Sequence, residues 1–249
     1  MTDAIRFDIK GYVGELCLCA PELRNAIGTR EISLVTAAIN SIPNTCRLFV
    51  IRSEGPVFCA GANLKEIADG TMNGEDFQSM TNAIASLTMP SLAIVEGDVF
   101  GGGVELLFSC DFRLGVTGKQ LKIPAAEVGL CYPVAGIERM TQRLGSSLVR
   151  KLLLTSQPVS FEELKKYNAF DWLVEPADCR ARALELITTL TSLAPLSISA
   201  MLSIIKAVEE YRFDPVEAQS AADACSASID LSEGLSALGE KRPPEFKGL

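Results

Sequence analysis

Two short stretches of small residues, each close to a polar side chain, suggest what chemistry this sequence performs. The first is Phe58–Glu66, which reads FCAGANLKE, and the second is Glu96–Glu105, which reads EGDVFGGGVE. Each follows an apolar run of β type, at 48–51 and 91–95, and the second opens into a helical pattern. A strand that ends at small residues and restarts as a helix leaves backbone N–H groups unpaired. Two such breaks side by side would offer one oxygen two N–H donors, which is the arrangement of an oxyanion hole.

Glu105 is the acidic residue that follows the glycine triplet, two positions after Gly103. A carboxylate at the start of a helix is favoured by the helix dipole, and this alone would explain its presence. The functional interpretation is a general acid or base. The chain contains no histidine, which excludes Ser-His and Cys-His triads and histidine metal sites. Acid–base chemistry must therefore use carboxylates, tyrosine, lysine, cysteine or bound water.

Alternating β and α patterns predict an α/β architecture. The expected strands are 5–9, 13–19, 48–51, 91–95, 112–116 and 168–174, and the expected helices are 29–41, 74–87, 104–110, 136–154 and 160–166. After residue 177 the chain is helical in pattern, at 178–193, 195–211 and 216–238. A change of composition near Glu175 divides the chain into a core, 1–175, and a helical C-terminal region, 176–249.

Composition is that of an ordinary enzyme that works in a reducing compartment. A chain of 249 residues can bury a large core, and its net charge of −8 argues against nucleic acid as a partner. We find no basic N-terminal segment before an apolar run and no run of transmembrane length, so we expect a cytoplasmic protein without a membrane partner. The eight cysteines contain no Cys-x-x-Cys pair, and we expect neither disulfides nor a metal site.

The two stretches resemble the signature segments of the crotonase superfamily, the enoyl-CoA hydratases and isomerases. Residues 97–111, GDVFGGGVELLFSCD, are similar to the family pattern G-x-x-x-G-G-G-x-E-L-x-x-x-C-D. The likeness extends from Pro21–Ala26 through 139–145 to 240–246, and so covers essentially the whole chain. It implies a crotonase-like core of ββα repeats arranged as a spiral. It also implies a helical C-terminal region that builds a homotrimer or hexamer and covers the acyl-CoA site.

By this resemblance, the oxyanion hole falls on the backbone N–H groups of Ala62 and Gly102 and stabilises the enolate of an acyl thioester. The resemblance implies no cofactor beyond the coenzyme A moiety of the substrate. Two carriers of the acyl group stay open, coenzyme A and an acyl-carrier protein. Arg24 and Lys65 match positions whose positive charges lie near the phosphates and pantetheine. The coenzyme A site is expected to be formed by Arg24, Ala60, Ala62, Asn63, Leu64 and Lys65.

The chain departs from the hydratase pattern at one important position. In the hydratases, the glutamate that matches Glu105 acts with a second glutamate to orient one water and move a proton. The second is expected twenty residues later, where this chain has Ala125 directly after Pro124. Ala125 therefore argues against full hydratase activity. Glu127 is the alternative second carboxylate, because on an extended segment a residue two positions further on points to the same side.

Tyr132 suggests a different reaction. Residues 128–137, VGLCYPVAGI, are similar to the methylmalonyl-CoA decarboxylase branch of the superfamily, which implies a tyrosine in the active site. Loss of CO₂ from a malonyl-type thioester leaves an enolate and needs only an oxyanion hole and a group that orients the leaving carboxylate. Those decarboxylases carry histidine where this chain has Ala62. The structural alternative for Tyr132 is a half-buried aromatic before a proline turn.

The sequence therefore predicts lyase chemistry, hydration or decarboxylation, or isomerase chemistry on an acyl-CoA thioester. The candidate catalytic positions are Ala62, Gly102, Glu105 and Tyr132. The alternative, from a different class of protein, is a non-catalytic acyl-thioester binder or an accessory protein of a biosynthetic pathway.

Overall fold

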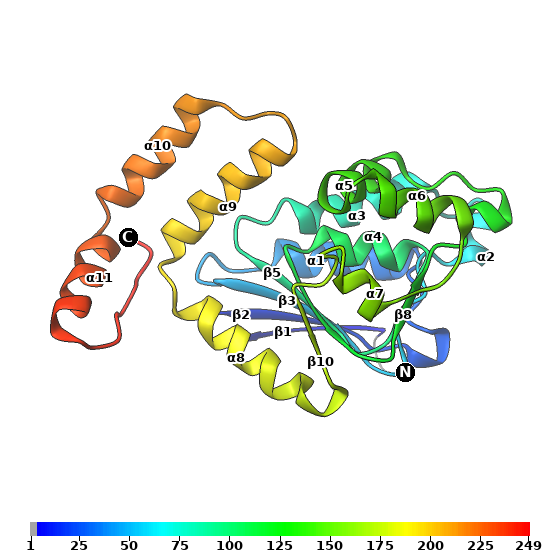
Figure 1. Ribbon diagram of the computed structural model, residues 1–249, viewed down its shortest axis with the longest axis horizontal. Coiled ribbons are helices and arrows are strands. Elements are labelled where there is room, and N and C mark those ends of the chain that lie inside the picture. The colour runs from blue at the N-terminus through cyan, green and yellow to red at the C-terminus, as the bar shows by residue number, and fades with distance from the viewer. Residues whose placement is uncertain (1–3) are drawn as a thin grey trace.

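The computed structural model describes residues 4–249 and contains a six-stranded sheet with helices on both faces (Figure 1). The antiparallel pair β1–β2 forms one edge, and the remaining neighbours pair in parallel. The strands are, in spatial order, β1 (Ile5–Lys10), β2 (Val13–Leu18), β3 (Leu48–Ser53), β5 (Ser91–Val95), β7 (Phe112–Val116) and β10 (Trp172–Val174). This confirms the expected α/β class, although the last strand is much shorter than 168–174.

A second sheet of four short strands was not expected from the sequence. Its strands are, in spatial order, β4 (Val57–Cys59), β6 (Asp98–Phe100), β8 (Gln120–Lys122) and β9 (Val159–Ser160). Strands of two or three residues are too short to show the period-two alternation by which strands are recognised. β4, β6 and β8 each follow a strand of the larger sheet, and α2 (Leu64–Ala68) and α4 (Gly102–Ser109) follow β4 and β6. This is the ββα repeat that the family resemblance implied.

The larger sheet is buried on both faces because its strands carry apolar residues at successive positions. In β3, Phe49 and Ile51 join the core beneath the main helical layer, whereas Leu48 and Val50 contact the opposite side. The main layer comprises α1 (Thr29–Asn40), α3 (Gly74–Ala85), α4, α5 (Val134–Leu144), α6 (Ser146–Thr155) and α7 (Phe161–Lys165). Helix α8 (Cys179–Ser192) covers the other face, on which Cys179, Ala183 and Leu186 are buried.

Three further helices extend away from the sheet at the C-terminal end of the chain (Figure 1). They are α9 (Pro195–Glu209), α10 (Pro215–Ser226) and α11 (Ile229–Glu240). The buried amine of Lys206 ties α9 to the core, because it donates to the Leu87 carbonyl (2.9 Å) and lies 3.3 Å from the Asp111 carboxylate. The ten strands of the described residues all precede this region. Helix α8 also precedes it and packs on the sheet, although α8 lies beyond residue 175, in the expected C-terminal region.

Two long helices that the sequence pattern suggested are each divided in the structure. The expected helix 136–154 breaks at Gly145, whose φ of 77° lies in the left-handed region that favours glycine. The expected helix 216–238 breaks before Ser228, whose hydroxyl accepts from the Leu231 amide as the N-cap of α11.

Between Ala4 and Leu249, no single helix is both long enough and apolar enough to cross a membrane. One pair of helical segments, Pro176–Ser192 and Pro195–Glu209, reaches that length and composition only when the two are counted together, across a bend of 100°.

Candidate active site

The turns that follow β4 and β6 bring Ala62 and Gly102 together. The two strands pair in parallel, and Gly61 and Gly101 turn the chain with positive φ values of 87° and 51°. A Cβ placed on Gly102 would lie 3.3 Å from the Ala62 nitrogen. Because a Cβ is two covalent bonds of about 1.5 Å from its own nitrogen, the two amide nitrogens are less than about 6.3 Å apart. Two donors to one oxygen, each about 3 Å from it, have such a separation.

The amides of Ala62 and Gly102 are also without acceptors. Neither donates a hydrogen bond to a backbone or side-chain group in residues 4–249. Three neighbouring amides are engaged: Gly61 donates to the Cys59 sulfur (3.3 Å), Gly101 to the Lys122 carbonyl (2.9 Å) and Asn63 to the Ile27 carbonyl (2.8 Å). Ala62 and Gly102 are both partly exposed. The site therefore presents two neighbouring N–H groups that a ligand oxygen can bind.

We expect Gly61→Ala to destabilise the fold and to weaken acyl-CoA binding. A Cβ at this position would overlap the Gly102 nitrogen, and the φ of 87° is already unfavourable for any residue with a side chain. Gly118→Ala is the matched control, because Gly118 has a φ of 75° but open space around its Cβ position. Urea unfolding should show a loss of about 1–2 kcal/mol for the control from the left-handed strain alone, and a larger loss for Gly61→Ala. Equal losses would mean that the Gly61–Gly102 approach is not tight.

Glu105 lies in the first turn of α4, three residues after Gly102, so both are on one face of the helix. Its side chain is 1% exposed. One carboxylate oxygen, Oε1, accepts from the Thr81 hydroxyl (3.3 Å) and from Arg139. Arg139 also donates to the Asn82 side-chain oxygen (2.6 Å) and is thereby held between α3 and α4. The other oxygen, Oε2, is fully buried and has no hydrogen-bond partner within the described part of the chain.

Burial raises the pKa of the Glu105 carboxyl above its ordinary value, and the positive charge of Arg139 opposes part of that effect. The group consequently holds its proton to a higher pH than an exposed glutamate. A carboxyl with a raised pKa and one unpaired oxygen is suited to taking up and returning a proton near neutral pH. Arg139, Thr81 and Asn82 were not identified as site residues from the sequence, where Arg139 appeared only as part of the family pattern.

Tyr132 is buried beside Glu105, with 6% of the residue exposed. A Cβ on Gly136 would overlap Glu105 Oε2 and come within 2.9 Å of the Tyr132 ring, so this glycine lets both groups approach. The Tyr132 hydroxyl donates to the Gly101 carbonyl (3.1 Å). Burial raises the pKa of Tyr132 well above its ordinary value, and the nearby Glu105 charge adds to this effect. The phenol is thus neutral, and its proton is already engaged by the backbone.

The structure does not bring a second carboxylate to Glu105. Ala125 is almost buried at the start of a short 3-10 helix, Ala125–Val128. Glu127, the alternative, has a side chain that is 49% exposed and forms an ion pair with Lys122 (2.9 Å). In residues 4–249, no other carboxylate shares the hydrogen-bond network of Glu105.

The residues expected to bind coenzyme A lie along the strands and turns that lead to these amides. The Ala60 amide donates to the Arg24 carbonyl (2.9 Å), and the Arg24 guanidinium lies 4.7 Å from the centre of the Phe100 ring. Asn63 is the N-cap of α2, since its side chain accepts from the Lys65 amide. Leu64 is 65% exposed, and neither Arg24 nor Lys65 forms an ion pair with any residue from 4 to 249.

The Cys59 thiol is not a candidate nucleophile or base in this site. Burial raises the pKa of the Cys59 thiol, which lies next to the Gly61 amide, to about 12, so it is not a thiolate at neutral pH. In the described region, one group of side chains has the composition of a metal site: Cys17, Cys19 and Glu54 lie within 4.8 Å of one another. The Glu54 carboxylate accepts from the Arg6 guanidinium (3.2 Å), whose positive charge beside the thiols disfavours a cation there.

Comparison with known proteins identifies the family. Residues 8–249 match the family model described as enoyl-CoA hydratase/isomerase, and the chain therefore belongs to that family. A mouse methylglutaconyl-CoA hydratase is 29% identical over 90% of this chain and 76% of its own length. A carnitinyl-CoA dehydratase of Salmonella arizonae is 29% identical over the whole of both chains. A probable enoyl-CoA hydratase/isomerase of Mycobacterium abscessus, of known structure, is 28% identical with a TM-score of 0.87 over both whole chains.

Family membership resolves the class of protein. The chain is an acyl-CoA thioester enzyme of the hydratase/isomerase family, with lyase or isomerase chemistry. The alternative of a non-catalytic thioester binder is not favoured. The crotonase fold is likewise confirmed, because a hydratase/isomerase family protein of Hyphomonas neptunium superposes with a TM-score of 0.91 at 25% identity, over 100% of this chain and 99% of its own.

Proposed function

We propose that this protein is an enoyl-CoA isomerase in which Glu105 moves a proton between the α and γ carbons of the acyl chain. One observation carries the proposal: Glu105 is a buried carboxylate with a single unpaired oxygen, and no second carboxylate of residues 4–249 shares its hydrogen-bond network. Hydration needs two carboxylates on one water, whereas a double-bond shift needs one base that returns the proton it has taken.

In the proposed reaction, the thioester oxygen of a 3-enoyl-CoA binds the amides of Ala62 and Gly102. Glu105 Oε2 removes a proton from the α carbon, and the electron pair moves into the thioester to form a dienolate. The two amides stabilise the negative oxygen. Glu105 then donates a proton to the γ carbon, which gives the 2-enoyl-CoA without net gain or loss of atoms. Arg139 and Thr81 hold the other oxygen, Oε1, and so fix the orientation of the carboxylate.

Coenzyme A is proposed to lie along Arg24, Ala60 and the segment from Ala62 to Lys65. The charges of Arg24 and Lys65 are available for phosphate, and the exposed Leu64 offers an apolar contact to the pantetheine. The names of relatives include both isomerase and hydratase reactions. One relative from Mycosarcoma maydis is named an enoyl-CoA isomerase/hydratase and is 28% identical over 95% of this chain and 93% of its own length.

Decarboxylation of a malonyl-type thioester is the second candidate, and the buried Tyr132 beside Glu105 is the observation that favours it. Two features argue the other way. The Tyr132 hydroxyl already donates to the Gly101 carbonyl, and an ionised Glu105 would repel a carboxylate placed next to it.

A thioester panel in D₂O tests the proposal. The purified protein is given 3-hexenoyl-CoA, 2-hexenoyl-CoA with water as the only co-substrate, and methylmalonyl-CoA. We expect conversion of the 3-enoyl to the 2-enoyl ester, with deuterium appearing at the α and γ carbons as the Glu105 proton exchanges with solvent. Release of CO₂ without any double-bond shift would replace the isomerase proposal by decarboxylation. Rapid water addition to the 2-enoyl ester would replace it by hydration.

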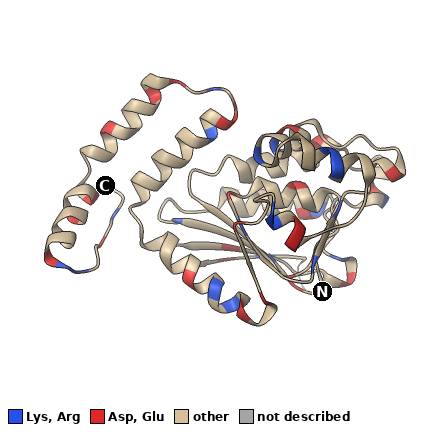
Figure 2. Ribbon diagram, viewed as in Figure 1, with Lys and Arg blue, Asp and Glu red and all other residues tan. Residues whose placement is uncertain are grey.

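A homotrimer or a hexamer is the proposed assembly. Helix α9 carries few charges, as Figure 2 shows. Both α9 and α11 expose large apolar side chains: Met201 (53%), Ile205 (54%), Leu235 (63%) and Leu238 (77%). Exposed apolar surface of this kind is usual at subunit interfaces. Light scattering is expected to give three or six times the 26.7 kDa of one chain. A monomer in dilute buffer would contradict the assembly and leave these helices without a partner.

A further inference from the structure

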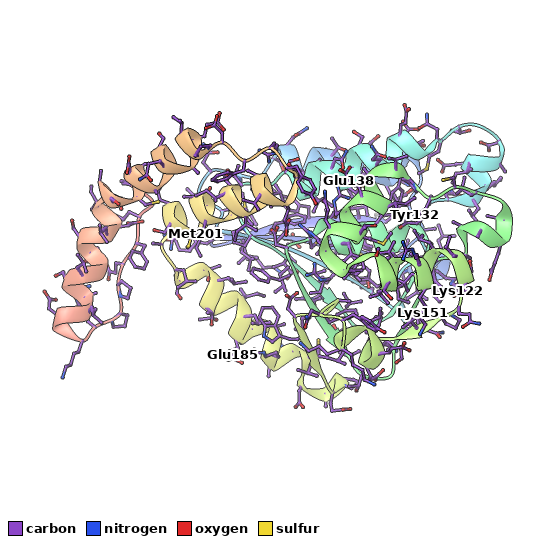
Figure 3. The ribbon with its side chains drawn as sticks, turned by 45° about the horizontal axis from the view of Figure 1, so that its top comes forward. Lys122, Tyr132, Glu138, Lys151, Glu185 and Met201 are labelled. Carbon is purple, nitrogen blue, oxygen red and sulfur yellow. The ribbon has the colours of Figure 1, made fainter. Side chains whose placement is uncertain are left out.

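The hydrogen bond from Tyr132 ends on one particular peptide group. Its hydroxyl donates to the carbonyl oxygen of Gly101, at 3.1 Å. The carbonyl of Gly101 and the amide of Gly102 belong to the same planar peptide unit, since the peptide bond joins them. Tyr132 therefore contacts one end of the unit whose other end is the unpaired N–H beside Ala62. Figure 3 places Tyr132 in the helical layer near α5, far from the exposed Met201 of α9.

The Gly101 carbonyl has both of its lone pairs occupied. In addition to the hydroxyl of Tyr132, it accepts from the Val104 amide (3.1 Å) in the first turn of α4. A carbonyl that accepts hydrogen bonds becomes more polarised, and the N–H of the same peptide becomes a stronger donor. This effect is largest where water is excluded, and both Tyr132 and Val104 are buried.

We propose that Tyr132 is a positioning residue that strengthens the Gly102 donor by hydrogen-bonding the far end of the Gly101–Gly102 peptide. This inference rests on the proposed oxyanion hole and adds to it a residue that supports one of the two donors. The phenol does not contact the substrate in this role. It orients the peptide, whose turn at Gly101 depends on a left-handed φ of 51°, and it increases the positive charge on the N–H that faces the thioester.

The kinetic consequence follows from where charge develops. The thioester oxygen gains negative charge only as the enolate forms, so a stronger donor stabilises the transition state more than the bound substrate. Loss of the Tyr132 hydroxyl should therefore lower kcat with little change in KM. Complete removal of an oxyanion donor costs about 10²–10³-fold in kcat, so weakening one donor should cost less, about tenfold.

Infrared spectroscopy of a bound, unreactive ester tests the inference without turnover. The probe is butyryl-CoA labelled with ¹³C at the thioester carbonyl, which has no double bond to move. Hydrogen bonding to the carbonyl lowers its stretching frequency. We expect a clear lowering in the unmodified protein and a smaller one in Tyr132→Phe, which keeps the ring and its packing. Tyr211→Phe is the matched control, because Tyr211 is 87% exposed, and it should behave as the unmodified protein.

A second variant moves the expected shift in the opposite direction and does not depend on removal of the hydroxyl. Site-specific incorporation of 3,5-difluorotyrosine at position 132 makes the phenol a stronger donor, and the carbonyl frequency should fall further. If the unmodified protein does not lower the frequency of bound butyryl-CoA, the oxyanion hole itself is wrong. If it does, but neither variant at 132 alters the shift, the hole stands and the role of Tyr132 is overturned.

Discussion

Glu105→Gln is expected to lose about 10²–10⁴-fold in the rate of double-bond isomerisation, which is the usual contribution of a general acid or base. Glutamine has nearly the same shape, and its oxygen can still accept from Thr81 and Arg139, but the amide cannot take up a proton. The affinity for butyryl-CoA should change little, because the backbone amides of Ala62 and Gly102 remain. The measurement is the rate of conversion of 3-hexenoyl-CoA, together with butyryl-CoA affinity by calorimetry.

Glu138→Gln supplies the control for this experiment. Glu138 is an exposed glutamate of α5 whose side chain accepts a hydrogen bond from Gln142 in its own helix, so the same chemical change should leave the rate unaltered (Figure 3). The pH profile gives a second check. Because burial raises the pKa of Glu105, the unmodified enzyme should gain activity as pH rises through a value above that of an ordinary glutamate. A Glu105→Gln variant with full activity would remove Glu105 from the mechanism.

Small residues made the backbone of the site predictable. The two stretches of small residues indicated an oxyanion hole, because a ligand oxygen can approach a main-chain N–H only where side chains are small, and the family resemblance assigned its donors to Ala62 and Gly102. The structure places these two amides next to each other and leaves them unpaired. The strands that lead into them were not found, because β4 and β6 have only three residues each and show no periodicity. Local composition thus indicated the turns, whereas the sheet that supports them depends on long-range pairing.

The side-chain network around Glu105 could not be predicted from sequence patterns. Arg139 is 34 residues from Glu105, and Asn82 is 57 residues from Arg139. Nothing in local spacing says that these groups share one ion-pair network. Tyr132 was recognised as a candidate. Its hydrogen-bond partner, the Gly101 carbonyl, could not be predicted, because every residue has such a backbone group. Glu127, the alternative second carboxylate, pairs with Lys122 and is half exposed, a partner that the sequence pattern did not indicate.

Ala125→Glu is expected to create water addition to 2-hexenoyl-CoA. By the family resemblance, Ala125 matches the position at which hydratases carry the second glutamate, and its side chain is nearly buried in the same core as Tyr132. A carboxylate there would hold one water together with Glu105, which is the arrangement that hydration needs. The buried charge should also cost about 1–3 kcal/mol of unfolding free energy. Hydration is measured by the loss of the conjugated thioester, and stability by urea unfolding.

Ala126→Glu is the matched control, because it makes the same change at the next residue, whose side chain is exposed. It should give neither hydration nor a loss of stability. In the double variant Ala125→Glu with Glu105→Gln, the gained hydration should disappear, since one carboxylate cannot both orient the water and move the proton. If the unmodified protein hydrates the 2-enoyl ester as fast as Ala125→Glu, a single carboxylate suffices in this site. The missing glutamate would then no longer distinguish isomerisation from hydration.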